Sequence, residues 1–303
     1  MNLTLAFSPC PNDTFAFHAM INSLVDTEGL TFTVEMSDVE ELNTRAAQGR
    51  YDICKLSYHA FFTIVSQYIM LRSGSALGFN NGPLLVKKIG HPNTSQLPDN
   101  KQKQPFASPL QPNILPDNPL IAIPGRHTTA ALLLKAAYPQ YTNLKPILFS
   151  DIEKAVLCNE VDAGVLIHEG RFTYKEKGLE LITDLGAFWQ NTFRHPIPLG
   201  GIAIKRELLH YKENPNNNEG DLAQKINRVL RRSIEYACAH PLASEEFIMQ
   251  NAQEITRQVQ QQHINLFVNN FTINIGTEGE KAVHFIYRKY FNTGKNLKLF
   301  IEE

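Results

Sequence analysis

Short apolar runs and amphipathic segments alternate along most of the chain, a pattern that predicts strands followed by helices. Near the N-terminus, the apolar run Asn2–Phe7 predicts a strand that leads through a turn into a helix at Phe15–Met20. The same order returns later, where a strand at Leu120–Ile123 leads through a turn into a helix at Ala130–Ala136. Two copies of one strand–turn–helix unit predict two similar α/β lobes.

Each copy is followed by a further predicted strand, and these two strands also resemble each other in sequence. Tyr51–Ser57 follows the first copy and Val161–His168 follows the second. If the lobes face each other, two helix N-termini converge on one cleft, where their backbone N–H groups attract negative charge. The repeat therefore predicts an anionic small molecule as the ligand.

The connections between the lobes define the expected architecture. A strand at Leu84–Lys88 is expected to leave the first lobe, and a strand at Pro196–Ile204 is expected to return to it. Because strands alternate with helices, we expect mainly parallel sheets. Two crossovers between two α/β lobes predict a bilobed, periplasmic-binding-protein-like (type II) fold, which closes around its ligand by hinge motion.

The two predicted crossovers also place the domain boundaries. Lobe 1 is expected to be discontinuous, at residues 1–86 and 203–303, and lobe 2 to occupy residues 87–202. A proline-rich stretch at 91–119 has no hydrophobic period and predicts a long surface loop.

Composition narrows the class of protein. The 303 residues carry a net charge of −1, with 43% hydrophobic and 19% charged residues, which is typical of a globular protein and gives no strong field for nucleic acid or an anionic membrane. No run of 18 apolar residues exists, and the N-terminal segment lacks a signal-peptide pattern, so we expect a cytoplasmic protein.

The four cysteines are widely spaced and form no metal-binding motif. Cys10, Cys54, Cys158 and Cys238 lack CxxC spacing, so neither a disulfide framework nor a zinc site is indicated, and we expect buried free thiols. Motifs for dinucleotides, phosphate loops, zinc hydrolysis and serine hydrolysis are also missing from the sequence.

In the first lobe, polar residues follow the predicted strands, where open α/β sheets bind ligands. After the first strand, Asn12 or Asp13 is expected either to cap a helix or to help cradle an anion, next to Ser8. Lys55 is unusual within an apolar strand because a buried lysine needs a partner or access to a cleft. Ser57 could donate a hydrogen bond to a carboxylate.

In the second lobe, two further groups of candidates follow the strands. Thr128 and Thr129 stand at a helix start, where hydroxyls and free N–H groups suit an anion. His168 stands at the end of a buried strand, where it is well placed to act as a general base, and Glu169 could orient the imidazole or face solvent.

Seven motifs spread over essentially the whole chain carry a family resemblance. In order, they are Ser8–Phe15, Asp52–Ala60, Gly74–Gly78, Gly82–Leu85, Pro124–Thr129, Gly164–Glu169 and Pro198–Gly201. In these motifs the sequence resembles the 1,4-dihydroxy-6-naphthoate synthases of the futalosine pathway of menaquinone biosynthesis.

The resemblance implies a fold, a reaction and a site. It implies a type II binding-protein fold used as a lyase, which converts cyclic dehypoxanthine futalosine into 1,4-dihydroxy-6-naphthoate without a metal or organic cofactor. His168 corresponds to the family's proton acceptor, and Lys55, Leu56, Ser57, Thr128 and Thr129 correspond to its substrate-binding residues. Ser8, Asn12, Asp13, Tyr58 and Glu169 are expected as further pocket residues.

Other functions stay open on the sequence. The alternatives are a sibling enzyme that dehydrates chorismate and a non-catalytic protein that binds small carboxylates. The expected partner is a small aromatic carboxylate joined to a sugar-derived ring, with no nucleic acid and no membrane. The sequence leaves open the oligomeric state and a second catalytic group, for which Lys55, Asp13 and Glu169 are candidates.

Overall fold

A computed structural model describes the chain except residues 91–114, 211–221, 253–255, 292–297 and 303. By its internal contacts the chain divides into two units: unit 1 comprises Met1–Asn81, His127–Thr129 and Pro196–Glu303, and unit 2 comprises Gly82–Arg126 and Ala130–His195. The boundaries expected at 86/87 and 202/203 thus fall at 81/82 and 195/196. Most of the expected loop at 91–119 lies outside the described residues.

Unit 1 contains a six-stranded sheet with the order β2-β1-β3-β11-β4, in which β5 also pairs with β11. The strands are β1 (Asn2–Phe7), β2 (Thr31–Met36), β3 (Ile53–Ser57), β4 (Tyr68–Met70), β5 (Ala76–Gly78) and β11 (Ile197–Lys205). β1 runs parallel to β2 and β3, whereas β11 runs antiparallel to β3, β4 and β5.

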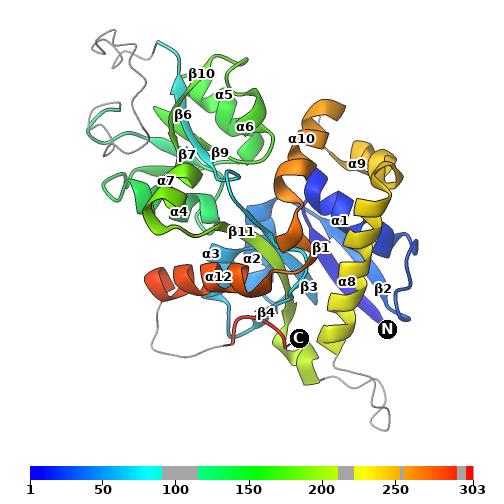
Figure 1. The fold of residues 1–303 in the computed structure, drawn as a ribbon. Coiled ribbons are helices and arrows are strands. Elements are labelled where there is room, and N and C mark those ends of the chain that lie inside the picture. Colours follow the sequence, from blue (N-terminus) through cyan, green and yellow to red (C-terminus); the bar gives the residue numbers. More distant parts are fainter. Residues whose placement is uncertain (91–114, 211–221, 253–255, 292–297, 303) are drawn as a thin grey trace. The chain divides into compact units, whose positions relative to one another are not determined.

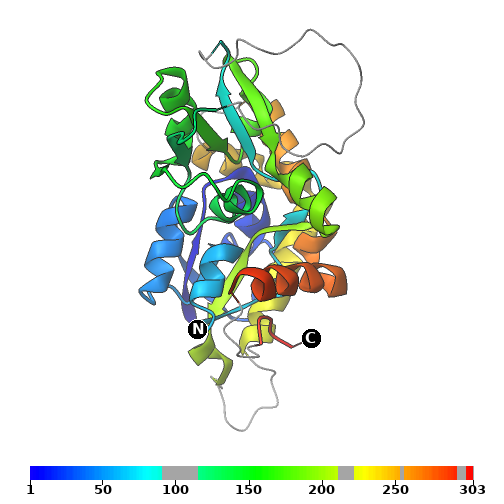
Figure 2. The ribbon, with the colours of Figure 1, turned by 90° about the vertical axis from the view of Figure 1, so that its left-hand side faces the viewer.

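Helices of unit 1 pack against this sheet and against one another. They are α1 (Pro11–Ile21), α2 (Val39–Ala47), α3 (Tyr58–Thr63), α8 (Leu222–Ala239), α9 (Glu245–Asn251), α10 (Arg257–Phe267), α11 (Asn270–Ile273) and α12 (Gly276–Phe291). α1 and α8 lie side by side over the apolar core, where Ser233 donates to the carbonyl of Ala16 at 2.7 Å. α3 and α12 also lie side by side, joined by the aromatic rings of Phe62 and Tyr287 (Figures 1 and 2).

Unit 2 contains a five-stranded sheet with the order β10-β6-β9-β7-β8. Its strands are β6 (Leu84–Lys88), β7 (Ile121–Ile123), β8 (Leu144–Pro146), β9 (Ala163–Leu166) and β10 (Leu179–Asp184). Its helices are α4 (Thr129–Ala137), α5 (Ile152–Leu157), α6 (Gly170–Thr173) and α7 (Leu185–Phe193). α5 packs so closely on β9 that a Cβ at Gly164 would lie 2.5 Å from the side chain of Ile152.

The repeat expected from the sequence is confirmed in the strand order. Unit 1 reads β2-β1-β3-β11 and unit 2 reads β8-β7-β9-β6, so the first strand of each repeat takes the same place. The expectation of mainly parallel sheets is wrong, because β6 and β11 run antiparallel to their neighbours. Each of these strands enters its sheet from the other unit rather than through a helical crossover, so the rule for parallel βαβ connections does not constrain its direction.

A capped helix start and the four thiols are smaller features of the fold. Asp38 caps α2 by accepting hydrogen bonds from the N–H groups of Glu40 and Glu41. Two of the free thiols, Cys10 and Cys54, are buried as expected. Cys158 and Cys238 are exposed, because each stands at or near the end of a helix, away from the apolar face.

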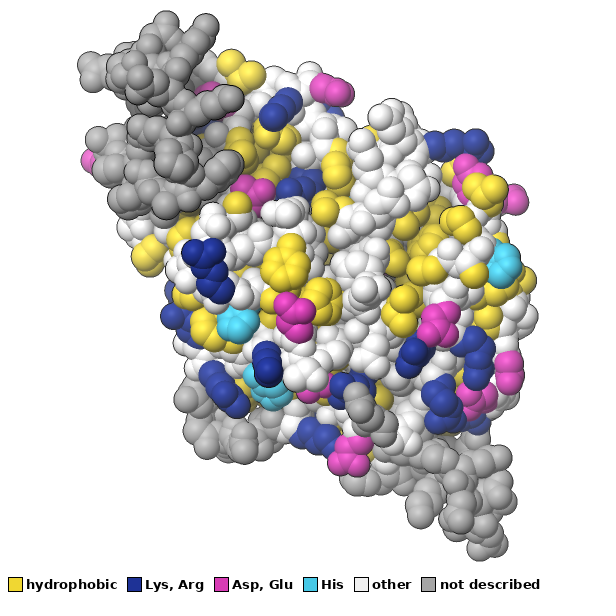
Figure 3. Space-filling model, in the orientation of Figure 1, with side chains coloured by type: hydrophobic (Ala, Val, Ile, Leu, Met, Phe, Trp, Pro, Cys, Tyr) yellow, Lys and Arg dark blue, Asp and Glu magenta, His cyan; other side chains and the backbone are white. Residues whose placement is uncertain are grey.

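The described surface carries no dominant charge on the face that Figure 3 shows, where basic and acidic side chains are interspersed among apolar ones. Within the described ranges, no helix is both long enough and apolar enough to span a bilayer.

Candidate functional site

A buried polar cluster lies where β1 and β3 of unit 1 end. The Lys55 ammonium contacts Asp13 Oδ1 at 2.7 Å, and both side chains are at most 10% exposed. Ser8 Oγ donates to Asp13 Oδ2 at 2.7 Å, and the amide of Asn12 donates to Oδ1 at 2.8 Å. The strand lysine therefore has an ionic partner, and the aspartate has donors on both oxygens, as a buried charge requires.

The expected helix cap at Asn12 or Asp13 is wrong. α1 begins at Pro11, and Cys10 is the residue before it, with no side-chain cap. Proline is favourable in the first helical position because its missing N–H has no partner there, so the helix starts earlier than the apolar pattern indicates. Asp13 is thus free of capping and points its carboxylate to Lys55 and Ser8.

Ser57, two residues beyond Lys55 on the same face of β3, is held by a side chain of α2. Its N–H donates to Asn43 Oδ1 at 3.0 Å, and Asn43 Nδ2 donates to Ser57 Oγ at 3.2 Å. Because a backbone N–H can only donate, the orientation of the Asn43 amide is settled by these contacts. Ser57 Oγ accepts from Asn43, so its own proton remains available as a donor.

The strand β11 passes close to these residues. Gly200 is paired with Ser57, and a Cβ at Gly200 would lie 2.8 Å from the carbonyl oxygen of Leu56 and 3.3 Å from Lys55 Cε. Only glycine fits at this position without displacing the backbone or the lysine.

The segment His127–Thr129, which follows β7 and ends at the first residue of α4, belongs to unit 1. The carbonyl of Thr128 lies 3.0 Å from His59 Nδ1, which must donate because the carbonyl only accepts. Thr129 Oγ1 donates to the carbonyl of Leu199 at 2.8 Å and accepts from the N–H of His59 at 3.4 Å. These contacts correct the expectation that the two threonines belong to lobe 2.

The threonine pair does not offer two equivalent hydroxyls. Thr128 and Thr129 are both 2% exposed, and the hydroxyl proton of Thr129 is already donated to Leu199. As the first residue of α4, Thr129 has a backbone N–H without an acceptor inside the helix. Its N–H, rather than its hydroxyl, is therefore the donor it can offer an anion.

Two other expected residues lie in the core. Leu56 is fully buried opposite Gly201, and Tyr58 is fully buried with its hydroxyl 2.8 Å from Ser75 Oγ. Burial raises the pKa of Tyr58, so the phenol stays neutral over the physiological range. Both residues support the site from within unit 1 by packing.

In unit 2, His168 follows β9 with a backbone φ of +53°, in the left-handed region that non-glycine residues seldom adopt. Its ring meets the edge of Phe149 at a centroid distance of 4.9 Å, and it is half-buried. Glu169 is half-buried and immediately precedes α6. Backbone strain of this kind clusters at functional sites, where the surrounding structure holds it in place.

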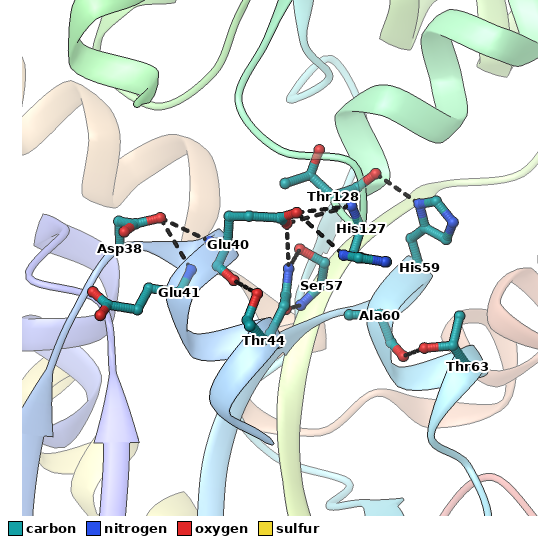
Figure 4. Close-up of polar contacts among 11 residues, drawn as sticks. Asp38, Glu40, Glu41, Thr44, Ser57, His59, Ala60, Thr63, His127 and Thr128 are labelled. Atoms are coloured by element: carbon teal, nitrogen blue, oxygen red, sulfur yellow. Dashed lines mark hydrogen bonds and ion pairs between the residues drawn. The ribbon is translucent and has the colours of Figure 1, made fainter. Parts of the chain in front are cut away.

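Sequence reasoning missed three residues that form a hydrogen-bonded network with Ser57. Glu40 and Asn43 lie on α2, where they resemble ordinary positions of an amphipathic helix, and His127 lies in the turn before the threonines. Figure 4 shows that the carboxylate of Glu40 joins His127 to the network around Ser57. The available signal was the polar Asn43 beside the apolar face of α2, at a position that proves to be 2% exposed.

No group of three or more His, Cys, Asp or Glu side chains in the described part of the chain is arranged to hold a metal ion.

Known proteins resemble this chain over most of its length. Residues 3–292 match the model of a family described as menaquinone biosynthesis. A protein of Thermus thermophilus named 1,4-dihydroxy-6-naphthoate synthase is 38% identical over 93% of this chain and 91% of its own. One of the same name from Streptomyces coelicolor is 32% identical over 93% of this chain and 90% of its own.

A solved structure supports the architecture. A Candida albicans protein, described as having the generic periplasmic-binding-protein fold, superposes with a TM-score of 0.64 at 12% identity, covering 100% of this chain and 99% of that chain. At this identity the likeness concerns the fold alone, and it agrees with the bilobed type II fold expected from the sequence.

Proposed function

Because the chain belongs to the menaquinone-biosynthesis family, we propose that it is a 1,4-dihydroxy-6-naphthoate synthase, a carbon–carbon lyase that acts on cyclic dehypoxanthine futalosine. The observation that carries this proposal is the likeness to two proteins of that name over 93% of the chain. In this reaction the sugar-derived ring is cleaved, a three-carbon product leaves, and the aromatic naphthoate remains.

Unit 1 supplies the groups that bind the substrate in this proposal. Ser57 has a hydroxyl proton to donate, because its oxygen accepts from Asn43. An ammonium has three N–H donors, and Asp13 is the acceptor that the described contacts give to Lys55. With the N–H of Thr129, these donors suit a carboxylate and the hydroxyls of a sugar-derived ring.

His168 supplies the general base. We propose that its imidazole removes a C–H proton of the bound substrate, and that the electron pair left behind forms a new double bond of the aromatic ring. The carbon–carbon bond to the three-carbon portion breaks, and that portion leaves with the electron pair of this bond and takes up a proton. The position of His168 supports this role, because it lies just after β9, at the carboxyl end of the strand, and is only half-buried. A positioned base of this kind typically contributes about 10²–10⁴-fold to the rate.

The test is turnover of cyclic dehypoxanthine futalosine by the purified protein, with the product identified by mass. His168→Asn is the sharpest variant, because asparagine tolerates the left-handed backbone while the imidazole is lost. We expect kcat to fall by at least about 100-fold. His240→Asn, at an exposed position just after α8, is the matched control and should keep wild-type turnover.

The possible outcomes test the proposed reaction and the role of His168 independently. Wild-type turnover with an equally active His168→Asn variant would keep the reaction and remove His168 as the base. Consumption of chorismate in place of cyclic dehypoxanthine futalosine would overturn the proposal in favour of the sibling dehydratase. Binding of either compound without turnover would instead indicate a carboxylate-binding protein.

A further inference from the structure

Three residues of unit 1 come from a part of the chain that otherwise builds unit 2. His127–Thr129 follow β7 and end at the first residue of α4, yet their contacts place them in unit 1. They carry the threonines that correspond to substrate-binding residues. His59 and Leu199 bond the two threonines directly, and Glu40 bonds the residue before them.

The carboxylate of Glu40 makes the charged contacts to this segment. Its two oxygens lie 3.2 and 3.3 Å from the backbone nitrogen of His127, and Oε1 lies 3.2 Å from His127 Nδ1 (Figure 4). A carboxylate that accepts a backbone N–H forms a stronger bond than a neutral acceptor. Glu40 thus fixes the backbone one residue before Thr128.

The carboxylate of Glu40 is also linked to Ser57, through Asn43. Asn43 Nδ2 donates to Glu40 Oε2 at 3.4 Å and to Ser57 Oγ at 3.2 Å, using both of its hydrogens. Because the Asn43 oxygen accepts the N–H of Ser57, every hydrogen-bonding group of this buried amide has a partner. One chain of contacts therefore runs from His127 through Glu40 and Asn43 to Ser57.

The helix α2 makes this bridge rigid. Glu40 and Asn43 are three residues apart, so they lie on one face of the helix. The helix begins at a capped end, because Asp38 accepts from two N–H groups of the first turn. The adjacent Glu41 points elsewhere and forms an ion pair with Arg45.

We propose that Glu40 is a positioning residue for the substrate: acting through His127 and Asn43, it holds the Thr128–Thr129 backbone and the Ser57 hydroxyl at the spacing that the bound carboxylate or ring hydroxyls require. This inference rests on the proposed function, since the residues that Glu40 aligns are those assigned to substrate binding. Glu40 itself touches neither the substrate nor His168 in this proposal.

The experiment compares Glu40→Gln with Glu41→Gln, two neighbours on α2 that lose the same charge. For cyclic dehypoxanthine futalosine, we expect Glu40→Gln to raise KM about tenfold or more while kcat stays within about threefold, because binding is weakened and the base is untouched. Glu41→Gln should leave both constants near wild type. Equal KM values in all three proteins would overturn the proposal.

A second measurement separates this inference from the proposed function. Amide hydrogen exchange of peptides that cover His127–Thr129, measured without substrate, should be faster in Glu40→Gln than in wild type and unchanged in Glu41→Gln. If the wild type does not turn over the substrate, the proposed function fails. The exchange comparison alone then tests whether Glu40 holds the segment His127–Thr129 in place. Unchanged exchange in Glu40→Gln would overturn this role of Glu40.

Discussion

At the residue scale, the ion pair between Lys55 and Asp13 is the most demanding feature of unit 1. Both groups are buried, so each has lost most of its hydration, and the loss is offset only by their contact and by the donors Ser8 and Asn12. Such a pair contributes little net stability over an apolar pair. Removing one partner, however, leaves the other charge buried without compensation.

We therefore expect Lys55→Met to lower the free energy of unfolding by about 3–5 kcal/mol, measured by urea denaturation. The double variant Lys55→Met with Asp13→Asn should recover part of this loss, because no buried charge is left. Arg231→Met is the control, since Arg231 and Glu235 form an exposed pair on α8 worth about 0.5 kcal/mol or less. An equal loss for Lys55→Met and Arg231→Met would contradict the prediction.

At the element scale, α1 packs against α9 through the ring contact of His18 with Phe247, whose centroids are 5.3 Å apart. Burial lowers the pKa of His18 below its ordinary value, because the charged imidazolium loses hydration. The unfolded chain therefore binds this proton more readily than the folded protein. The stability that neutral His18 contributes is present above the unfolded pKa and is lost as the pH falls through the folded pKa.

His18→Leu should accordingly make the free energy of unfolding fall less between pH 7.5 and pH 5.5 than it does in the wild type. Leucine keeps an apolar contact with Phe247 and has no proton to bind. The measurement is urea denaturation at several pH values across this window. The same loss in both proteins would show that His18 does not contribute to the acid sensitivity.

At the scale of the whole molecule, unit 1 is assembled from three segments of the chain. The last segment supplies β11, which pairs with β3, β4 and β5 and so joins the N-terminal strands into one sheet. It also supplies α8, whose apolar face covers α1 and β1. The N-terminal strands of unit 1 thus depend on residues more than a hundred positions away.

A chain that ends at His195 should therefore fail to fold unit 1, because β3 loses its antiparallel neighbour and α1 loses its cover. We expect amide exchange in β1 and β3 to approach that of an unfolded chain, whereas the full-length protein protects both strands. Protection of these strands in the shortened chain would contradict the prediction and would mean that the first 81 residues fold without β11.

The elements of this protein could largely be predicted from its sequence, because the signals are local. The strand at Asn2–Phe7 and the helix cap at Asp38 follow from apolar alternation and capping chemistry within a few residues. The position of Lys55 was also predictable, since a charge in an apolar strand needs a partner. Its partner was not identified, because Asp13 is 42 residues away and resembled a helix cap.

The sequence by itself determined the repeated strand–turn–helix units, the family and the residues at the strand ends, since each depends on patterns along the chain. Only the tertiary structure decided that His127–Thr129 belong to unit 1, that β6 and β11 run antiparallel, and that Glu40 bridges His127 and Asn43. Glu40 and His127 are 87 residues apart. Contacts over such separations depend on how finished elements pack, which no local pattern records.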